Sequence, residues 1–174
     1  MADPLQSVRL AQQKHLRDVQ EAMVKATRQA GEVVFDAMYE ETSLIDHDLA
    51  ALRRMGHPYR KDDPQGVPHP DWLVHHQSGD LQETLSFRYP VVRGDEVVAE
   101  IHSEAPYTWY LLLGTRYMRP RDFVTAALYN TRGTVGDIYE QNFKGTLDTQ
   151  GNEHYEMKVN AIPHDIYPAQ LPES

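Results

Sequence analysis

The sequence predicts an α+β domain in which a small antiparallel sheet packs with helices and a long N-terminal helix comes first. Three observations lead to this class. Residues 4–40 carry apolar side chains at helical spacing, residues 85–101 alternate between apolar and polar side chains, and residues 123–143 return to helical spacing. Helices, then a hairpin, then a helix and a late strand form an order typical of α+β domains rather than of alternating βαβ folds.

The long N-terminal helix is expected to begin at Pro4, because Asp3 is a capping acid and proline fits the first helical position. From Leu5 to Met38 apolar residues recur at gaps of mostly three and four, which places them on one stripe. At about 1.5 Å per residue this helix would reach roughly 55 Å, more than the diameter of a small domain. We therefore expect that it bends near Gly31 or that part of it reaches onto another subunit.

A second helix is expected over residues 43–56. Ser43 and Asp46 resemble a capping box there, and Gly56 is placed to end the helix. The next stretch, residues 57–77, holds four prolines and a glycine and has little periodicity. A loop of this length in a compact domain is usually functional or ordered by a partner.

A β-hairpin is predicted after one capped helical turn over residues 78–85. Gly94 and Asp95 form its turn. Pro90 indicates that the first strand lies at a sheet edge, because proline cannot donate a ladder hydrogen bond. The alternation assigns these side chains to the buried face of the two strands: Leu85, Phe87, Tyr89, Val91, Val97, Ala99 and Ile101.

A short helix and then a sharp corner are expected over residues 105–122. Trp109, Leu112 and Leu113 are spaced for one buried face of the short helix. Gly114 ends the apolar run and allows the chain to turn sharply.

A longer helix is expected from Phe123 to Phe143, although Gly133 and Gly136 weaken its middle and could split it. Residues 154–161 alternate again and predict a late strand. The chain therefore divides into an N-terminal helical arm (1–56), an extended Pro- and His-rich loop (57–77), an α+β core (78–145) and a C-terminal strand and tail (146–174).

Composition excludes several classes of function. The formal net charge is −9 and no basic stripe exists, so high-affinity DNA or RNA binding through phosphate neutralisation is not expected. The absence of cysteine rules out disulfides and thiolate metal sites. No window approaches 18 apolar residues, and the first residues do not form a signal peptide. We expect a soluble, intracellular protein.

Histidines and aspartates are concentrated in the extended loop, which invites a metal-site interpretation. Their spacing, however, matches no recognised zinc pattern, and there is neither a G-x-S-x-G nucleophile motif nor a glycine-rich phosphate loop. We therefore expect no catalytic residues, no cofactor and no metal ion. The alternative is a metal-dependent hydrolase or nuclease that uses His57, Asp62, Asp63, His69, Asp71, His75 and His76.

Five short motifs follow one another between residues 78 and 130. In order they are Ser78-Gly79-Asp80-Leu81, Ala105-Pro106-Tyr107, Leu113-Gly114-Thr115, Met118-Arg119-Pro120 with Phe123, and Ala126-Ala127-Leu128. This ordered set, with the hairpin between the first two motifs, resembles the neck, or tail-completion, protein family of long-tailed bacteriophages.

The resemblance implies a structural virion protein without enzymatic activity, which forms a ring in the phage neck and joins the DNA-filled head to the tail. Its expected place is the neck or tail of the virion, assembled in the cytoplasm of the bacterial host. Expected partners are further copies in a six- or twelvefold ring, neighbouring connector and tail-tube proteins, and phage DNA that passes through without sequence-specific binding; no membrane is involved. A net-negative channel would let DNA slide without sticking.

The corner segment, residues 110–123, is the candidate subunit interface. Arg116, Arg119 and Arg121 are expected at its rim, where guanidinium groups can bind carboxylates of a neighbouring subunit. The alternative is a corner that only caps the domain core. The predicted interface residues are Tyr110, Gly114, Thr115, Arg116, Arg119, Pro120, Arg121 and Phe123.

Other functions stay open beside the connector. Within the same particle the chain could be a tail terminator or a head-closure protein. Outside it, a prophage-borne binding module whose long helix merely dimerises would also fit. A mass measurement separates these, because a dimer at all concentrations favours the last and six- or twelvefold particles favour a ring.

Overall fold

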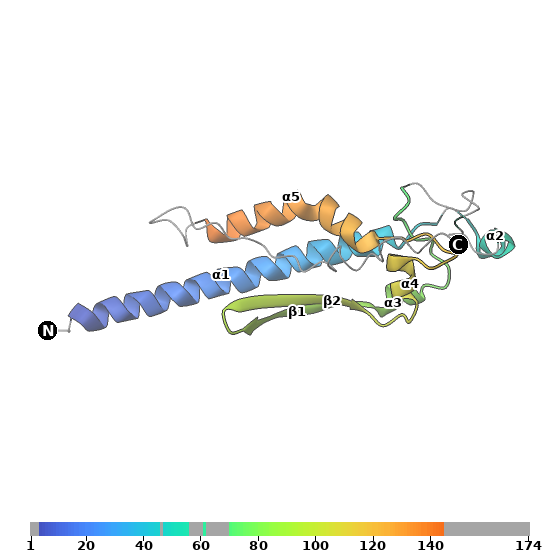
Figure 1. The fold of residues 1–174 in the computed structure, drawn as a ribbon. Coiled ribbons are helices and arrows are strands. Elements are labelled where there is room, and N and C mark those ends of the chain that lie inside the picture. The colour runs from blue at the N-terminus through green and yellow to red at the C-terminus, as the bar shows by residue number, and fades with distance from the viewer. Residues whose placement is uncertain (1–3, 46, 56–60, 62–69, 145–174) are drawn as a thin grey trace.

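The structure, a computed structural model, describes residues 4–45, 47–55, 61 and 70–144. It confirms an α+β fold with a long N-terminal helix and a small antiparallel sheet (Figure 1). In chain order the elements are α1 (Pro4–Glu41), α2 (Leu49–Met55), α3 (Asp80–Thr84), β1 (Leu85–Arg93), β2 (Glu96–Ser103), α4 (Thr108–Leu113) and α5 (Phe123–Phe143).

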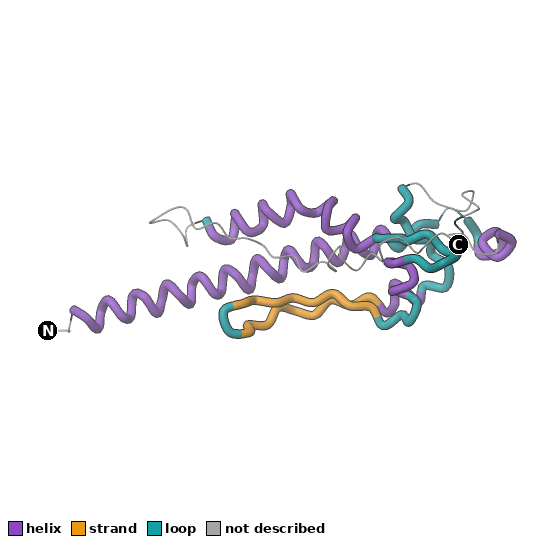
Figure 2. The backbone as a smooth tube through the Cα atoms, in the orientation of Figure 1, coloured by secondary structure: helices purple, strands orange, loops and turns teal. Residues whose placement is uncertain are grey.

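The elements are arranged in three layers, with α1 in the middle. The hairpin β1–β2 lies along one side of α1 and α5 along the other (Figure 2). α5 runs antiparallel to α1, because Thr27 Oγ1 lies 3.0 Å from the Tyr139 hydroxyl while Asn130 Nδ2 donates to Glu41 Oε1 at 3.1 Å. Glu41 also accepts a hydrogen bond from Trp72 Nε1, at 2.9 Å, which fastens the segment before α3 to the end of α1.

Gly31 does not bend α1, which continues through it as one helix of 38 residues. Its role is close packing. A Cβ atom at this position would lie 2.4 Å from Cε2 of Phe87, so only glycine lets the β1 ring approach the helix backbone. The Phe87 ring is held there by Phe35 and Tyr89, whose ring centroids lie 6.4 and 5.5 Å away.

The hairpin has the predicted turn at Gly94 and Asp95, with Gly94 at a φ of 68°. Among the described residues the sheet has two strands, so both are edges, and the register shifts between Arg88 and Val91, around Pro90. The burial that the alternation predicted for β1 ends at Phe87. Exposed fractions there are 61% for Tyr89 and 48% for Val91, and the Tyr89 ring instead lies beneath the guanidinium of Arg28, with 4.7 Å from Cζ to the ring centroid.

Two sequence expectations about helix boundaries were wrong. Residues 43–45, 47 and 48 are not helical: Leu44 forms a parallel bridge with His75, and α2 begins after Asp48, whose Oδ1 accepts from the Ala51 backbone at 2.5 Å. Ser43 therefore caps no second helix. In α5 the two glycines do not split the helix, which runs unbroken from Phe123 to Phe143 and is held to α1 on either side of them by the hydrogen bonds Asn130–Glu41 and Asn142–Gln29. Asp46, Gly56 and the predicted late strand lie outside the described residues.

The core lies where α1, α5 and the segment around α3 and α4 meet. Among the described residues its fully buried apolar members are Ala26 of α1 and Phe123 and Ala127 of α5. Small side chains on α1 allow the two helices to approach closely, as in other packed helix pairs. Residues 5–18 of α1, in contrast, are exposed along their whole length, beyond the ends of both α5 and the hairpin (Figure 1).

Candidate assembly surface

The corner segment is a closed loop that requires glycine at its start. Gly114 has a φ of 69°, and a Cβ atom there would lie 2.7 Å from the Met118 carbonyl oxygen and 2.8 Å from the Pro120 nitrogen. The Thr115 backbone donates to that Met118 oxygen at 2.9 Å. The Thr115 hydroxyl accepts from the Tyr117 and Met118 backbones at 3.2 and 3.1 Å. The corner is therefore fixed by its own hydrogen bonds.

The inner side of the corner is buried. Phe123 and the Arg121 side chain have no exposed surface, and Met118 is 5% exposed. The Arg121 backbone donates to the Leu111 carbonyl at 2.6 Å, and its Nη1 donates to the Asp71 carbonyl. The expectation that Arg121 lies at the rim was wrong. This arginine is buried, and its hydrogen bond to the Asp71 carbonyl connects the corner to the segment before α3. Phe123, a second predicted interface residue, is also inaccessible to a neighbour.

The outer side of the corner carries an exposed aromatic face, defined here as Trp109, Tyr110, Leu113 and Tyr117. Their exposed fractions are 58, 60, 37 and 69% in that order. On α4 the first and third of these are one helical turn apart, so they share a side. Arg116 covers part of the Tyr117 ring, with its Cζ 5.5 Å from the ring centroid. Contiguous solvent-facing apolar groups commonly mark a protein contact.

The predicted buried face of α4 is right for Leu112 and wrong for Trp109 and Leu113. Leu111 and Leu112 are each 7% exposed and enter the core, whereas Trp109 and Leu113 point outward. Every residue from 109 to 113 is apolar, so spacing alone could not select a face. Trp109, Leu113 and Tyr117 are the surface residues that sequence reasoning missed.

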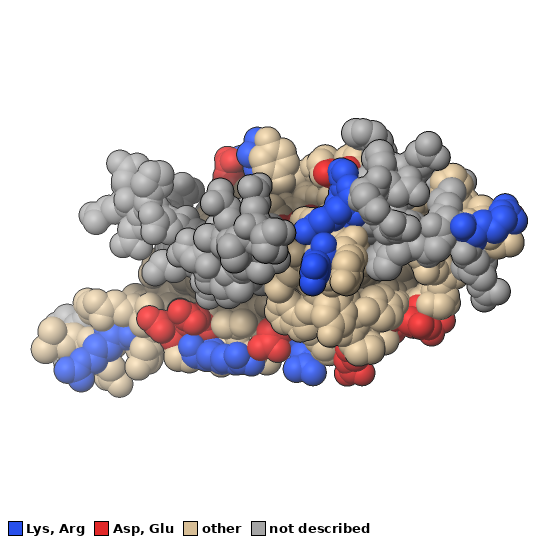
Figure 3. Space-filling model, turned by 45° about the vertical axis from the view of Figure 1, so that its right-hand side comes forward, with Lys and Arg blue, Asp and Glu red and all other residues tan. Residues whose placement is uncertain are grey.

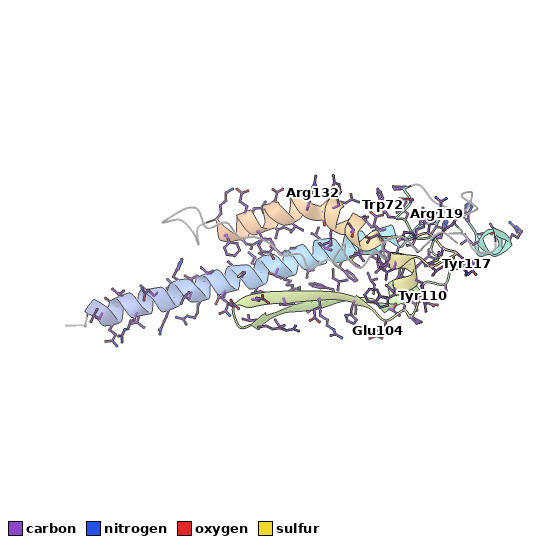
Figure 4. The ribbon with its side chains drawn as sticks, in the orientation of Figure 1. Trp72, Glu104, Tyr110, Tyr117, Arg119 and Arg132 are labelled. Atoms are coloured by element: carbon purple, nitrogen blue, oxygen red, sulfur yellow. The ribbon has the colours of Figure 1, made fainter. Side chains whose placement is uncertain are left out.

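The remaining predicted interface residues stay accessible to different degrees. Tyr110, Arg116 and Pro120 are exposed, whereas Gly114 and Thr115 are half-buried. Arg119 is also half-buried, and its Nη2 donates to the Lys61 carbonyl at 3.0 Å. Figure 4 shows Arg119 on the α5 side of this end of the molecule and Glu104 on the hairpin side, with Tyr110 between them.

A pocket of about 540 Å³ opens beside Tyr110. Its volume falls in the range of pockets that hold small ligands. The polar groups of Thr42 and Gln82 are already used: the first donates to the Met38 carbonyl at 3.1 Å and the second to Ser43 Oγ at 2.5 Å. The other lining residues are Val74, His75, His76, Gln77, Ser78, Gly79, Leu81, Tyr107, Tyr110, Leu111, Thr115 and Met118.

Tyr107 lines this pocket, and the pKa of its hydroxyl is perturbed. Burial, and then the negative charge of Asp80, raise the pKa of its hydroxyl, while hydrogen bonds with the Ser78 side chain and the Leu81 backbone act in the opposite direction. The phenol is thus neutral at physiological pH. Asp80 lies in the sequence between Gly79 and Leu81, which both line the pocket.

The histidines of the extended loop are only partly described. His75 is buried, its ring centroid lies 5.7 Å from that of His47, and the adjacent His76 lines the pocket. Within the described ranges no three His, Asp or Glu side chains gather as metal ligands would. His57, Asp62, Asp63 and His69 lie outside the described residues.

Comparison with known proteins identifies no relative. No protein-family model matches the chain, and neither a curated protein nor a solved structure matches it significantly. Among the described helices, none combines the length and apolarity needed to cross a membrane.

Proposed function

We propose that this chain is a structural subunit of the neck of a long-tailed bacteriophage, where copies form a ring that joins the DNA-filled head to the tail. Tail termination and head closure are variants of the same role in the same particle. In this proposal the chain works by assembly, without catalysis or a cofactor. DNA passes through the ring without sequence-specific contacts, consistent with a net charge of −9.

Two kinds of observation support the proposal. The ordered motifs that resemble the family coincide with successive elements: α3, the hairpin, α4, the corner and the start of α5. The elongated shape, with an uncovered helix end far from the corner, suits a subunit that must touch neighbours at both ends (Figure 1).

The aromatic face of the corner is the single observation that carries the proposal. The corner is locked by Gly114 and its backbone hydrogen bonds, and three aromatic rings on the corner and the adjoining α4 face solvent. Rigid aromatic side chains on a preorganised loop lose little conformational entropy when they are buried, which makes them typical anchors of protein interfaces.

The solution test is the mass of the full chain by sedimentation velocity over a wide concentration range, for the parent and three variants. The parent is expected to give six- or twelvefold particles, and Trp109→Glu and Tyr117→Glu should lower that mass. Tyr129→Glu is the matched control, because Tyr129 is an equally exposed aromatic residue (62%) on α5 outside the face. A parent dimer at every concentration, or a loss of particles with Tyr129→Glu alone, would contradict the proposal.

The genetic test is deletion of the gene from its source genome. Negative-stain images should then show DNA-filled heads separated from tails, and a plasmid copy should restore joined particles. Joined, infectious particles in the deletion strain would contradict the proposed role, even if the purified chain assembles in solution.

A further inference from the structure

α1 carries one apolar stripe along its whole length, and the described chain covers only its C-terminal part. Val8 and Ala26 are eighteen positions apart, as are Leu16 and Val34, which is about five full turns of helix. Each pair therefore lies on the same line along the helix. Exposed fractions are 54% against 0% for the first pair and 67% against 9% for the second. The uncovered part, residues 5–18, is called the protruding segment below.

The protruding segment is basic in an acidic protein. It holds Arg9, Lys14 and Arg17 against Asp18, whereas the whole chain has a net charge of −9. Figure 3 shows its basic side chains at the free end of the helix. An exposed helix with an apolar stripe flanked by cations is suited to an acidic partner that has an apolar groove.

An acidic rim with such a groove lies at the opposite end of the molecule. We define the rim as Asp80, Glu83 and Glu104, all exposed, and residues 78–84 and 103–110 around them contain no Lys or Arg. The Glu104 backbone donates to the Thr84 carbonyl at 3.3 Å, which joins the two stretches. Gly79, Leu81 and Gln82 of the first stretch, and Tyr107 and Tyr110 of the second, line the 540 Å³ pocket.

One chain cannot bring these two surfaces together. α1 is a single helix of 38 residues, about 57 Å long, and it separates the protruding segment from the rim (Figures 1 and 4). A contact between them must therefore join two copies. Because the two surfaces differ, the contact joins unlike surfaces of two copies, and repeated from copy to copy it forms a ring where the rotation closes.

We propose that the protruding segment of one copy docks onto the acidic rim of the next, with the apolar stripe of the segment against Tyr110 and the pocket. The second copy is the favoured occupant because charge and apolarity match at both ends of the same chain. This inference rests on the proposed function only in taking the chain to self-assemble, and it names the two surfaces that meet.

The absence of cysteine allows a clean cross-linking test. Leu16→Cys in a mass-tagged chain is mixed with untagged Glu83→Cys and treated with a bifunctional maleimide. A covalent tagged–untagged pair is the expected product. Arg132→Cys is the control, because Arg132 is an exposed arginine on the outer side of α5 (Figure 4) and should give no pair with Glu83→Cys.

Reversing charges tests the electrostatic contribution to the proposed docking without cross-linking. Arg17→Glu should weaken self-association about fivefold, the upper effect of an exposed ion pair, and Glu83→Arg in the same chain should restore it. The corresponding reversal at Arg132 should change nothing.

The outcomes separate this inference from the proposed function. Particles that assemble while Leu16→Cys and Glu83→Cys give no tagged–untagged pair, or no more of it than Arg132→Cys and Glu83→Cys give, would overturn the docking and leave the ring intact. A monomer that gives no cross-linked pair at any concentration would overturn the docking, and deletion-strain particles would then decide the neck role independently.

Discussion

The two long helices, α1 and α5, lie side by side and contain glycine, yet they use it differently. α1 is enclosed by the hairpin and by α5, so its middle must be narrow, and Gly31 makes room for the Phe87 ring. Within the described part of the chain α5 packs mainly against α1, and no described atom lies within 4 Å of a Cβ atom added at Gly133 or Gly136. A glycine in a helical sequence thus indicates close packing only where a second element covers that face.

The largest expected effect contrasts the enclosed and uncovered parts of α1. Met38→Ala, at a residue 7% exposed, should lower the free energy of unfolding by about 2–5 kcal/mol, because it leaves a cavity in the core. Leu16→Ala, at a residue 67% exposed, should change it by less than about 0.5 kcal/mol. Urea unfolding of dilute protein measures both. Equal losses would mean that another part of the chain covers the protruding segment in the monomer.

The next effect tests the close approach at Gly31. Gly31→Ala gains about 1 kcal/mol of helix propensity but must displace the Phe87 ring, at a cost of about 1–3 kcal/mol. The single variant should therefore be destabilised or neutral. In a Phe87→Ala background the same change should be stabilising, because the clash is gone. A double-mutant cycle from urea midpoints gives the coupling, and a value near zero would refute the packing role.

The fold was predictable where the side-chain period is unambiguous. The turn at Gly94 and Asp95 and the inward positions of Leu85 and Ile101 follow from a period of two, since a one-residue slip would reverse every side chain. The orientation of α4 was not predictable, because consecutive apolar residues carry no period.

The candidate surface was predicted less well, for reasons that lie in tertiary contacts. An arginine beside a proline is expected at the surface. Arg121 is nevertheless buried, and the Asp71 carbonyl, fifty positions away in the sequence, accepts its hydrogen bond. Local sequence contains no signal for such a partner. Gly114 was identified correctly as the turn residue, since its positive φ is a local property.

A smaller effect of opposite sign is expected on α5. Gly133→Ala should stabilise the protein by roughly 0.5–1 kcal/mol, because the backbone there is helical and a methyl group meets no neighbour. Thermal unfolding monitored by circular dichroism is the measurement, with Gly136→Ala as a second example on the same helix. Destabilisation by both would show that this side of α5 is covered in the assembled form, and a comparison of dilute with concentrated protein would test that directly.

The smallest effect concerns the pocket wall at high pH. Burial and Asp80 raise the pKa of Tyr107, so the folded state keeps this proton to a higher pH than the unfolded chain does. The resulting contribution to stability is full below the unfolded value, about pH 10, and is lost as pH rises toward the folded value. Tyr107→Phe should be slightly less stable near neutrality, because its hydrogen bond with Ser78 is lost, but should lose less stability between about pH 9 and pH 11 than the parent. Urea midpoints across this range measure the slope, with Tyr117→Phe controlling for the removal of an exposed phenol. Parallel slopes for Tyr107→Phe and the parent would mean that the phenol is as well solvated in the folded protein as in the unfolded chain, and that the pocket wall is open to water at this point.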